Sequence, residues 1–173
     1  ITAYSNSFGL PVDKFYFVPY HTTLDIKHIK ISSGGYLFSG GNANRDYATL
    51  ARAVSGLNIK VRIACSKRSA LNGIDFPPNV EVSPVSHKEF RRLMAGCKIN
   101  VVSMESGHLH SGGQQTFLNA MALGKPVIVT DPEGAEDYIQ TGFNGFLVPP
   151  ADYKALRSAI EYILEKNEDA IKI

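Results

Sequence analysis

The stretch of sequence best suited to chemistry is a polar run between residues 108 and 116. Two histidines, two glycines and four hydroxyl or amide side chains are too polar for a simple connection. They are His108, His110, Ser111, Gly112, Gly113, Gln114, Gln115 and Thr116. The glycines let a ligand approach the backbone, and N–H groups at the start of a following helix attract an anion. The run therefore predicts an anion-binding loop; the plain alternative is a solvated loop with idle histidines.

A second glycine-rich run, residues 39–46, joins Gly40 and Gly41 to Arg45. It lacks the G-K-S/T ending of a P-loop and the G-x-G-x-x-G of a dinucleotide fingerprint. Free N–H groups of a following helix, with Arg45 as a cation, predict phosphate binding here as well. Lys67 is a further candidate cation. The alternative is an ordinary glycine turn with Arg45 in solvent.

Metal binding is not expected from these residues. His108 and His110 supply two ligands without a convincing third, and neither Cys65 nor Cys97 has supporting spacing. The chain is therefore predicted to hold no metal and no resident cofactor. In residues 131–137, Gly134 is expected to open a short helix whose acidic residues stabilise its dipole.

The surrounding pattern predicts the elements that position these loops. Short, mostly apolar runs alternate with amphipathic helical patterns, which is typical of a doubly wound, Rossmann-like α/β fold with a parallel sheet. Helices are expected to begin at Asn44 as the N-cap, at a capping box that starts with Ser86, before Phe117, and at Asp152. The expected strands are 15–18, 36–39, 60–65, 80–82, 99–102, 127–129 and 146–148. Ligands of such sheets bind at the carboxyl ends of the strands.

Composition describes an ordinary globular domain. The 173 residues are 44% hydrophobic and 20% charged, and a formal charge of +2 gives no reason to expect nucleic acid. No apolar run approaches the roughly 20 residues that span a bilayer. Residues 1–30 are interpreted as an entry segment from a missing amino-terminal domain, and residues 31–173 as the domain that carries these loops. We expect a cytoplasmic protein, with peripheral association at the inner face of the membrane left open.

Residues 111–128 resemble the core stretch of group 1 glycosyltransferases, which runs E-x-F-G-x-x-x-x-E-A-M-A-x-G-K-P-V-I. Residues 134–139 and 142–150 resemble the family elements G-x-x-E-x-I and G-x-N-G-x-L-V-x-P. Residues 38–46 lie where the family has its phosphate loop. The resemblance implies one half of a two-domain GT-B enzyme, the carboxy-terminal half that binds a UDP or GDP sugar. It also implies hexosyl transfer to an acceptor, with retention and without metal, together with an amino-terminal acceptor domain. This chain alone is then expected to bind and not to catalyse.

The sequence departs from the family at three positions. The two family glutamates become Ser111 and Asn119, and the arginine after the strand glycine becomes Gly41, which leaves Arg45 as the remaining cation. In the family the first glutamate lies near the donor sugar and the second accepts from ribose hydroxyls. The resemblance therefore implies His110 and Ser111 as catalytic residues. The predicted donor-binding residues are Gly40, Gly41, Arg45, Lys67, Gly112, Gly113, Gln114, Gln115, Thr116 and Asn119.

Two other functions remain open at this point. The two lost glutamates favour a non-catalytic nucleotide-binding or interaction module of the same fold. A sugar-nucleotide epimerase, which also uses paired domains of this type, is the weaker alternative because no carboxylates are evident near the sugar.

Overall fold

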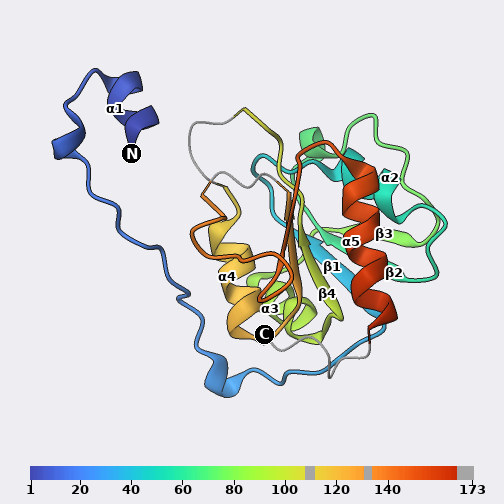
Figure 1. The fold of residues 1–173 in the computed structure, drawn as a ribbon. Helices are drawn as coiled ribbons and strands as arrows, with labels where there is room; N and C mark the ends of the chain where they lie inside the picture. The colour runs from blue at the N-terminus through green and yellow to red at the C-terminus, as the bar shows by residue number, and fades with distance from the viewer. Residues whose placement is uncertain (108–111, 131–133, 167–173) are drawn as a thin grey trace.

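The computed structural model describes residues 1–107, 112–130 and 134–166. They form a six-stranded, all-parallel sheet with helices on both faces, in the order β3-β2-β1-β4-β5-β6 (Figure 1). No helix in these ranges is long and apolar enough to cross a membrane. The strands are β1 (Tyr36–Gly40), β2 (Lys60–Ala64), β3 (Val80–Ser83), β4 (Ile99–Val102), β5 (Val127–Thr130) and β6 (Phe146–Val148).

The central strands are buried on both faces, and their sequences show why. Every residue of β4 and β5 is buried, as expected for mostly apolar strands that are covered on both faces of a parallel sheet. In register, Leu37 of β1 lies beside Ile99 of β4. The chain order reverses between β1 and β4, and a switch point of this kind is where ligands bind in open α/β sheets. The predicted doubly wound fold is confirmed.

Two helical layers enclose the sheet (Figure 1). On one face, α2 (Tyr47–Val54) and α5 (Tyr153–Glu165) bury an apolar cluster that includes Leu37 and Ile128. On the other, α3 (His87–Gly96) and α4 (Gln114–Ala122) bury a cluster that includes Phe38 and Val102. Each face removes a continuous apolar surface from water, which is the main favourable contribution to folding.

The helix starts agree in part with the sequence. Asp152 caps α5 as predicted, accepting from two backbone N–H groups. Asp46 caps α2 by accepting from the Thr49 N–H at 2.9 Å, so the prediction of Asn44 as the cap is wrong. A carboxylate there also satisfies an N–H group that was expected to face an anion. Ser86 caps α3, but the Glu89 carboxylate bonds Arg92, and no return bond to the Ser86 N–H is present among the described residues.

Two predicted elements are wrong. Residues 15–18 form no strand; Tyr16 is 85% exposed and Val18 is 79% exposed. An apolar run becomes a strand only when a neighbouring strand pairs with it, and the sheet ends at β3 and β6 without reaching this segment. Residues 134–138 form turns closed by the Ile139 N–H on the Ala135 carbonyl instead of a short helix.

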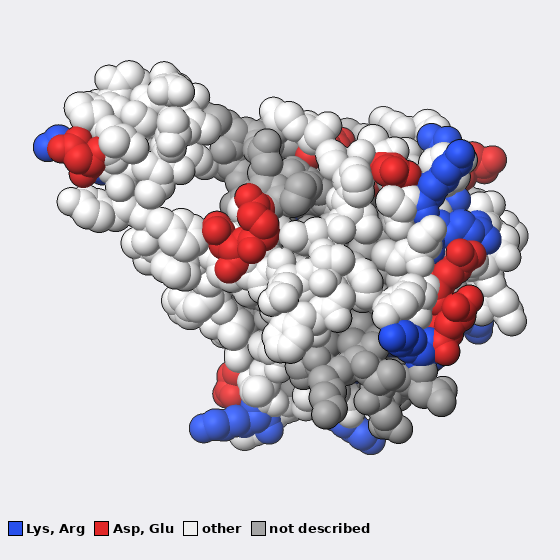
Figure 2. All heavy atoms as spheres, in the orientation of Figure 1, with Lys and Arg blue, Asp and Glu red and all other residues white. Residues whose placement is uncertain are grey.

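The amino-terminal segment, residues 1–35, projects from the body and then runs beside it toward β1 (Figures 1 and 2). It contains α1 (Thr2–Phe8) and the 3-10 turns Val12–Lys14 and Ile26–His28. Lys125, which lies in the sequence G-K-P, is buried and donates to the Ser32 carbonyl at 2.5 Å. Positively and negatively charged side chains are interspersed over the face in Figure 2.

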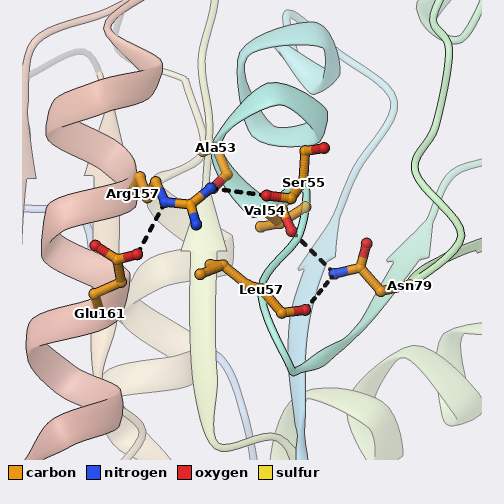
Figure 3. A network of polar contacts seen from close by, with 7 residues as sticks. All are labelled: Ala53, Val54, Ser55, Leu57, Asn79, Arg157 and Glu161. Atoms are coloured by element: carbon orange, nitrogen blue, oxygen red, sulfur yellow. Dashed lines mark hydrogen bonds and ion pairs between the residues drawn. The ribbon is translucent and has the colours of Figure 1, made fainter.

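A polar network closes the carboxyl end of α2 (Figure 3). Arg157 of α5 donates to the Ser55 carbonyl at 2.8 Å and is held by Glu161 at 2.9 Å. The Asn79 amide nitrogen lies within 3.2 Å of three carbonyls, those of Val54, Leu57 and Ile59. Because the last carbonyls of a helix have no partner within it, these side chains stabilise the end of α2.

Candidate functional site

An open hollow of about 1310 Å³ lies beyond the carboxyl ends of β1 and β2. One wall is residues 23–25 and 28–30 of the amino-terminal segment, and another is residues 85–92 at the start of α3. The floor combines residues 41–42 and 64–66, which follow β1 and β2, with Gln115, Thr116 and Asn119 of α4. Ligand pockets of drug size occupy roughly 300–1,000 Å³, so the hollow has room for a nucleotide sugar.

The loop after β1 is shaped by two glycines and one asparagine. A Cβ on Gly40 would lie 2.7 Å from Cζ of the Phe90 ring, and Gly41 has a φ of 128°. The Asn42 carboxamide oxygen accepts from the N–H groups of Ser66 and Lys67 at 2.9 and 3.1 Å. Both glycines are therefore required by packing or backbone geometry, and Asn42 holds the loops after β1 and β2 together.

Arg45 lies beneath this loop and not in solvent. It is only 7% exposed, and its guanidinium donates to the carbonyls of Gly40 and Ala43, each at 3.0 Å. It also contacts the sulfur of Met104 and, at 3.3 Å, the Thr116 hydroxyl. Burial lowers the pKa of this guanidinium. Arg45 therefore connects the loop after β1 to the start of α4, and its direct contact with phosphate stays a prediction.

The start of α4 is left open by the glycines before it. Gly113 is the N-cap residue with a φ of 76° and supplies no side-chain cap. The Thr116 N–H is used, since it donates to the Gly113 carbonyl at 2.8 Å. The N–H groups of Gln114 and Gln115 donate to no residue within the described ranges. The contact of the Gln114 and Gln115 N–H groups with an anion stays a prediction, and the Thr116 N–H is already used within the helix.

A contact that the sequence did not predict joins the amino-terminal segment to α4. We call residues 20–24 the crossing segment. The Tyr20 hydroxyl donates to Gln115 at 2.8 Å, and Gln115 donates to the Thr23 hydroxyl at 2.9 Å. The Thr22 hydroxyl donates to Asn119 at 2.7 Å. These pairs are more than 90 residues apart in sequence, and only the hydroxyl-rich composition of the crossing segment hinted at them.

The lining of the hollow carries a positive excess. Four lysines and arginines face two carboxylates, those of Asp25 and Glu89. The Arg92 guanidinium pairs with Glu89 at 2.5 Å, and this hydrogen bond lowers the pKa of the Glu89 carboxyl. The lining favours an anionic ligand, because charges of one sign in a cleft raise the local concentration of the opposite ion. The basic residues are Lys30, Lys88, Arg91 and Arg92.

The predicted site residues thus fall into three groups. Gly41, Gln115, Thr116 and Asn119 line the hollow, whereas the Lys67 side chain is exposed and not part of its lining. His108, His110 and Ser111 lie outside the described residues. In the ranges that are described, no three His, Cys, Asp or Glu side chains are grouped to hold a metal ion. The remaining predicted residues are not among those that line the hollow: Gly40, Arg45, Gly112, Gly113 and Gln114.

Comparison with known families identifies the chain. The sequence model of the family "Glycosyl transferases group 1" matches residues 77–173, which include α3, α4 and α5. The chain belongs to this family. An uncharacterized glycosyltransferase of Methanocaldococcus jannaschii is 26% identical over 96 residues, covering 56% of this chain and 22% of that protein.

Solved glycosyltransferases share the fold of this group 1 chain. The Anabaena protein HepE, in complex with UDP and glucose, matches with a TM-score of 0.60 and 18% identity over 79% of this chain and 41% of HepE. The catalytic domain of a Helicobacter pylori cholesterol-α-glucosyltransferase matches with a TM-score of 0.58 and 14% identity over 79% and 91%. Sucrose-phosphate synthase of Thermosynechococcus elongatus matches with a TM-score of 0.58 and 16% identity over 98% and 41%. The chain thus spans less than half of HepE.

Proposed function

We propose that this group 1 glycosyltransferase domain binds a nucleoside diphosphate sugar, with UDP or GDP as the nucleotide, in the hollow. The observation that carries the proposal is the open start of α4 beside a lining with four basic and two acidic side chains. A helix start with free N–H groups is suited to a phosphate. HepE, which shares the fold, is described in complex with UDP and with UDP-glucose.

In the proposed reaction, the glycosyl group passes to an acceptor with retention at the anomeric carbon. The leaving diphosphate gains negative charge while the sugar acquires oxocarbenium character. The N–H groups of Gln114 and Gln115 donate to the departing oxygens, and Arg45 fixes their position from below. One such fixed donor typically contributes about 2.7–4 kcal/mol to lowering the barrier. His110 and Ser111 are the proposed catalytic residues beside the sugar.

The proposal includes an acceptor domain that precedes this chain. Large apolar side chains are exposed along residues 1–20, among them Phe8, Leu10, Tyr16 and Phe17. Contiguous exposed apolar surface is typical of a contact with another domain. The acceptor would bind between the two domains, so transfer requires both. We place the full-length enzyme in the cytoplasm, with the inner face of the membrane as a site of peripheral association.

Calorimetry on the purified chain tests the proposal. We expect UDP or GDP to bind at least tenfold more tightly than the matching monophosphate, since each charge-assisted hydrogen bond contributes about 1.5–3 kcal/mol. We expect the same affinity in EDTA as with added divalent ions. Equal affinity for mono- and diphosphates would remove the phosphate argument, and an EDTA-sensitive affinity would overturn the metal-free proposal.

A non-catalytic binding module is a second candidate, because the sequence lacks both family glutamates at Ser111 and Asn119. Turnover of donor by the full-length protein distinguishes the two. In the enzyme we expect His110→Ala to impair transfer more than nucleotide binding; full activity of that variant would remove His110 from the catalytic residues. Product analysis excludes an epimerase if the sugar is transferred with its configuration unchanged at every carbon other than C1.

A further inference from the structure

The contact between Thr22 and Asn119 fixes the direction of a carboxamide in the hollow. The Thr22 hydroxyl accepts from the Leu24 N–H at 3.2 Å and lies 2.7 Å from the carboxamide oxygen of Asn119. The Leu24 N–H takes one lone pair of the Thr22 oxygen, and the Thr22 hydroxyl donates its proton to the carboxamide oxygen of Asn119. The acceptor end of Asn119 is therefore occupied by the amino-terminal segment.

The donor end of Asn119 has no such partner. A carboxamide carries one acceptor oxygen and two N–H donors. Across the described part of the chain, no residue accepts from the Asn119 amide nitrogen, although Asn119 is half-buried and lines the hollow. With its oxygen held by Thr22, the side chain presents N–H groups to whatever occupies the hollow.

Thr22 is itself held in place by its neighbours in the crossing segment. The Tyr20 N–H donates to the Tyr138 hydroxyl at 2.6 Å, and the Tyr20 hydroxyl bonds Gln115. Gln115 also bonds Thr23. Three hydrogen bonds therefore flank the Thr22 contact. The hollow exists with the crossing segment in this position, because Thr23 and Leu24 form part of its wall. The segment completes the site and does not fill it.

We propose that Thr22 is a positioning residue that fixes the Asn119 carboxamide so that its N–H donates to a ribose hydroxyl oxygen of the bound nucleotide. This inference rests on the proposed function and assigns a part of the site to the amino-terminal segment. The family resemblance expects a glutamate here that accepts from ribose hydroxyls. In this chain the direction of that hydrogen bond is reversed, and the ribose hydroxyl is the acceptor.

The test measures UDP and GDP affinity, by calorimetry, for the 173-residue parent chain and four variants of it. Thr22→Val removes the hydroxyl at nearly constant volume, and we expect about tenfold weaker binding. Thr22→Ser keeps the hydroxyl, and we expect affinity within about twofold of the parent. On an Asn119→Leu background, Thr22→Val is expected to have no further effect, because Thr22 acts through Asn119. Melting curves establish that each variant folds.

The 2′-deoxy and 3′-deoxy nucleotides give a readout that a structural role would not change. The parent should discriminate against at least one of them by about tenfold, and Thr22→Val should reduce that factor to about twofold. Unchanged affinity in Thr22→Val, or equal losses in the serine and valine variants, would refute the inference alone. A loss from Thr22→Val that persists on the Asn119→Leu background would refute it too. A parent that binds neither UDP nor GDP would refute the proposed function, and with it this inference.

Discussion

Replacing Arg45 with methionine tests whether this arginine stabilises the fold or binds the ligand directly. Methionine keeps most of the length of the side chain and removes the guanidinium. In the structure the guanidinium donates to the carbonyls of Gly40 and Ala43 at 3.0 Å and connects the loop after β1 to α4. We therefore expect Arg45→Met to lower the stability of the chain even when no ligand is present.

The magnitude follows from opposing contributions. Two hydrogen bonds from a charged donor contribute about 1.5–3 kcal/mol each, and their loss takes the guanidinium donor from the carbonyl of buried Gly40. Removing a buried charge also removes its desolvation cost, which the lowered pKa of Arg45 reflects. The expected net loss is about 3 kcal/mol. For a chain of this size, about 2–4 °C per kcal/mol converts this to a fall in Tm of about 6–12 °C.

Thermal unfolding followed by circular dichroism measures this difference. Arg68→Met is a matched control, because Arg68 is exposed and its loss should shift Tm by less than 2 °C. UDP and GDP affinity is measured for the same proteins well below their Tm. If Arg45→Met has the same Tm as the parent but binds the diphosphate more than tenfold more weakly, Arg45 contacts phosphate and does not stabilise the fold.

Three further predictions concern Gly41, Asn79 and Cys97. Gly41→Ala should lower the free energy of unfolding in urea by about 1–3 kcal/mol, because a φ of 128° is strained for alanine and its Cβ would lie 2.7 Å from the Arg45 guanidinium. Gly35→Ala is the control, because a Cβ there meets nothing within 4 Å. Asn79→Ala should cost about 2–3 kcal/mol in the same assay, since it removes the amide shared by three carbonyls at the end of α2, and a loss below 0.5 kcal/mol would contradict that role. Burial raises the pKa of the Cys97 thiol to about 12 from an ordinary value of 9.0. The unfolded thiol therefore ionises first, and its contribution to the free energy of unfolding is lost as pH rises above about 9. Over that range the free energy of unfolding of Cys97→Ala should fall less steeply with pH than that of the parent.

Local patterns predicted the sheet well. The runs at 99–102 and 127–129 are mostly apolar because they are covered on both faces, and the structure confirms both as strands. The run at 15–18 has the same apolar character, but it finds no partner strand, and pairing is not encoded in composition. Glycines and polar residues at strand ends also indicated the edge of the sheet at which the hollow lies.

The sequence could not predict contacts between distant residues. Arg45 looked like an exposed cation at the start of a helix, yet it is covered by Met104 and Thr116, which are 59 and 71 residues away. The hydroxyl-rich composition around Thr22 did not indicate its partner, because that partner depends on the path by which the amino-terminal segment reaches Asn119. The sequence of residues 85–92 predicted only the start of a helix. In the structure α3 packs beside β1, and these residues form a wall of the hollow.

The Arg45 guanidinium occupies the space that a side chain at position 41 would need, and this restricts which pairs of residues the loop can accept. A side chain at 41 collides with the guanidinium at 45, and the backbone at 41 is already in a region that favours glycine. Substitutions at the two positions are therefore epistatic, and their order matters. The arginine that the family resemblance expects at position 41 can be accommodated only after a smaller residue has replaced Arg45 and the loop backbone has changed conformation. A mutant library that varies position 41 alone will return glycine, whereas one that varies both positions together can recover the alternative arrangement.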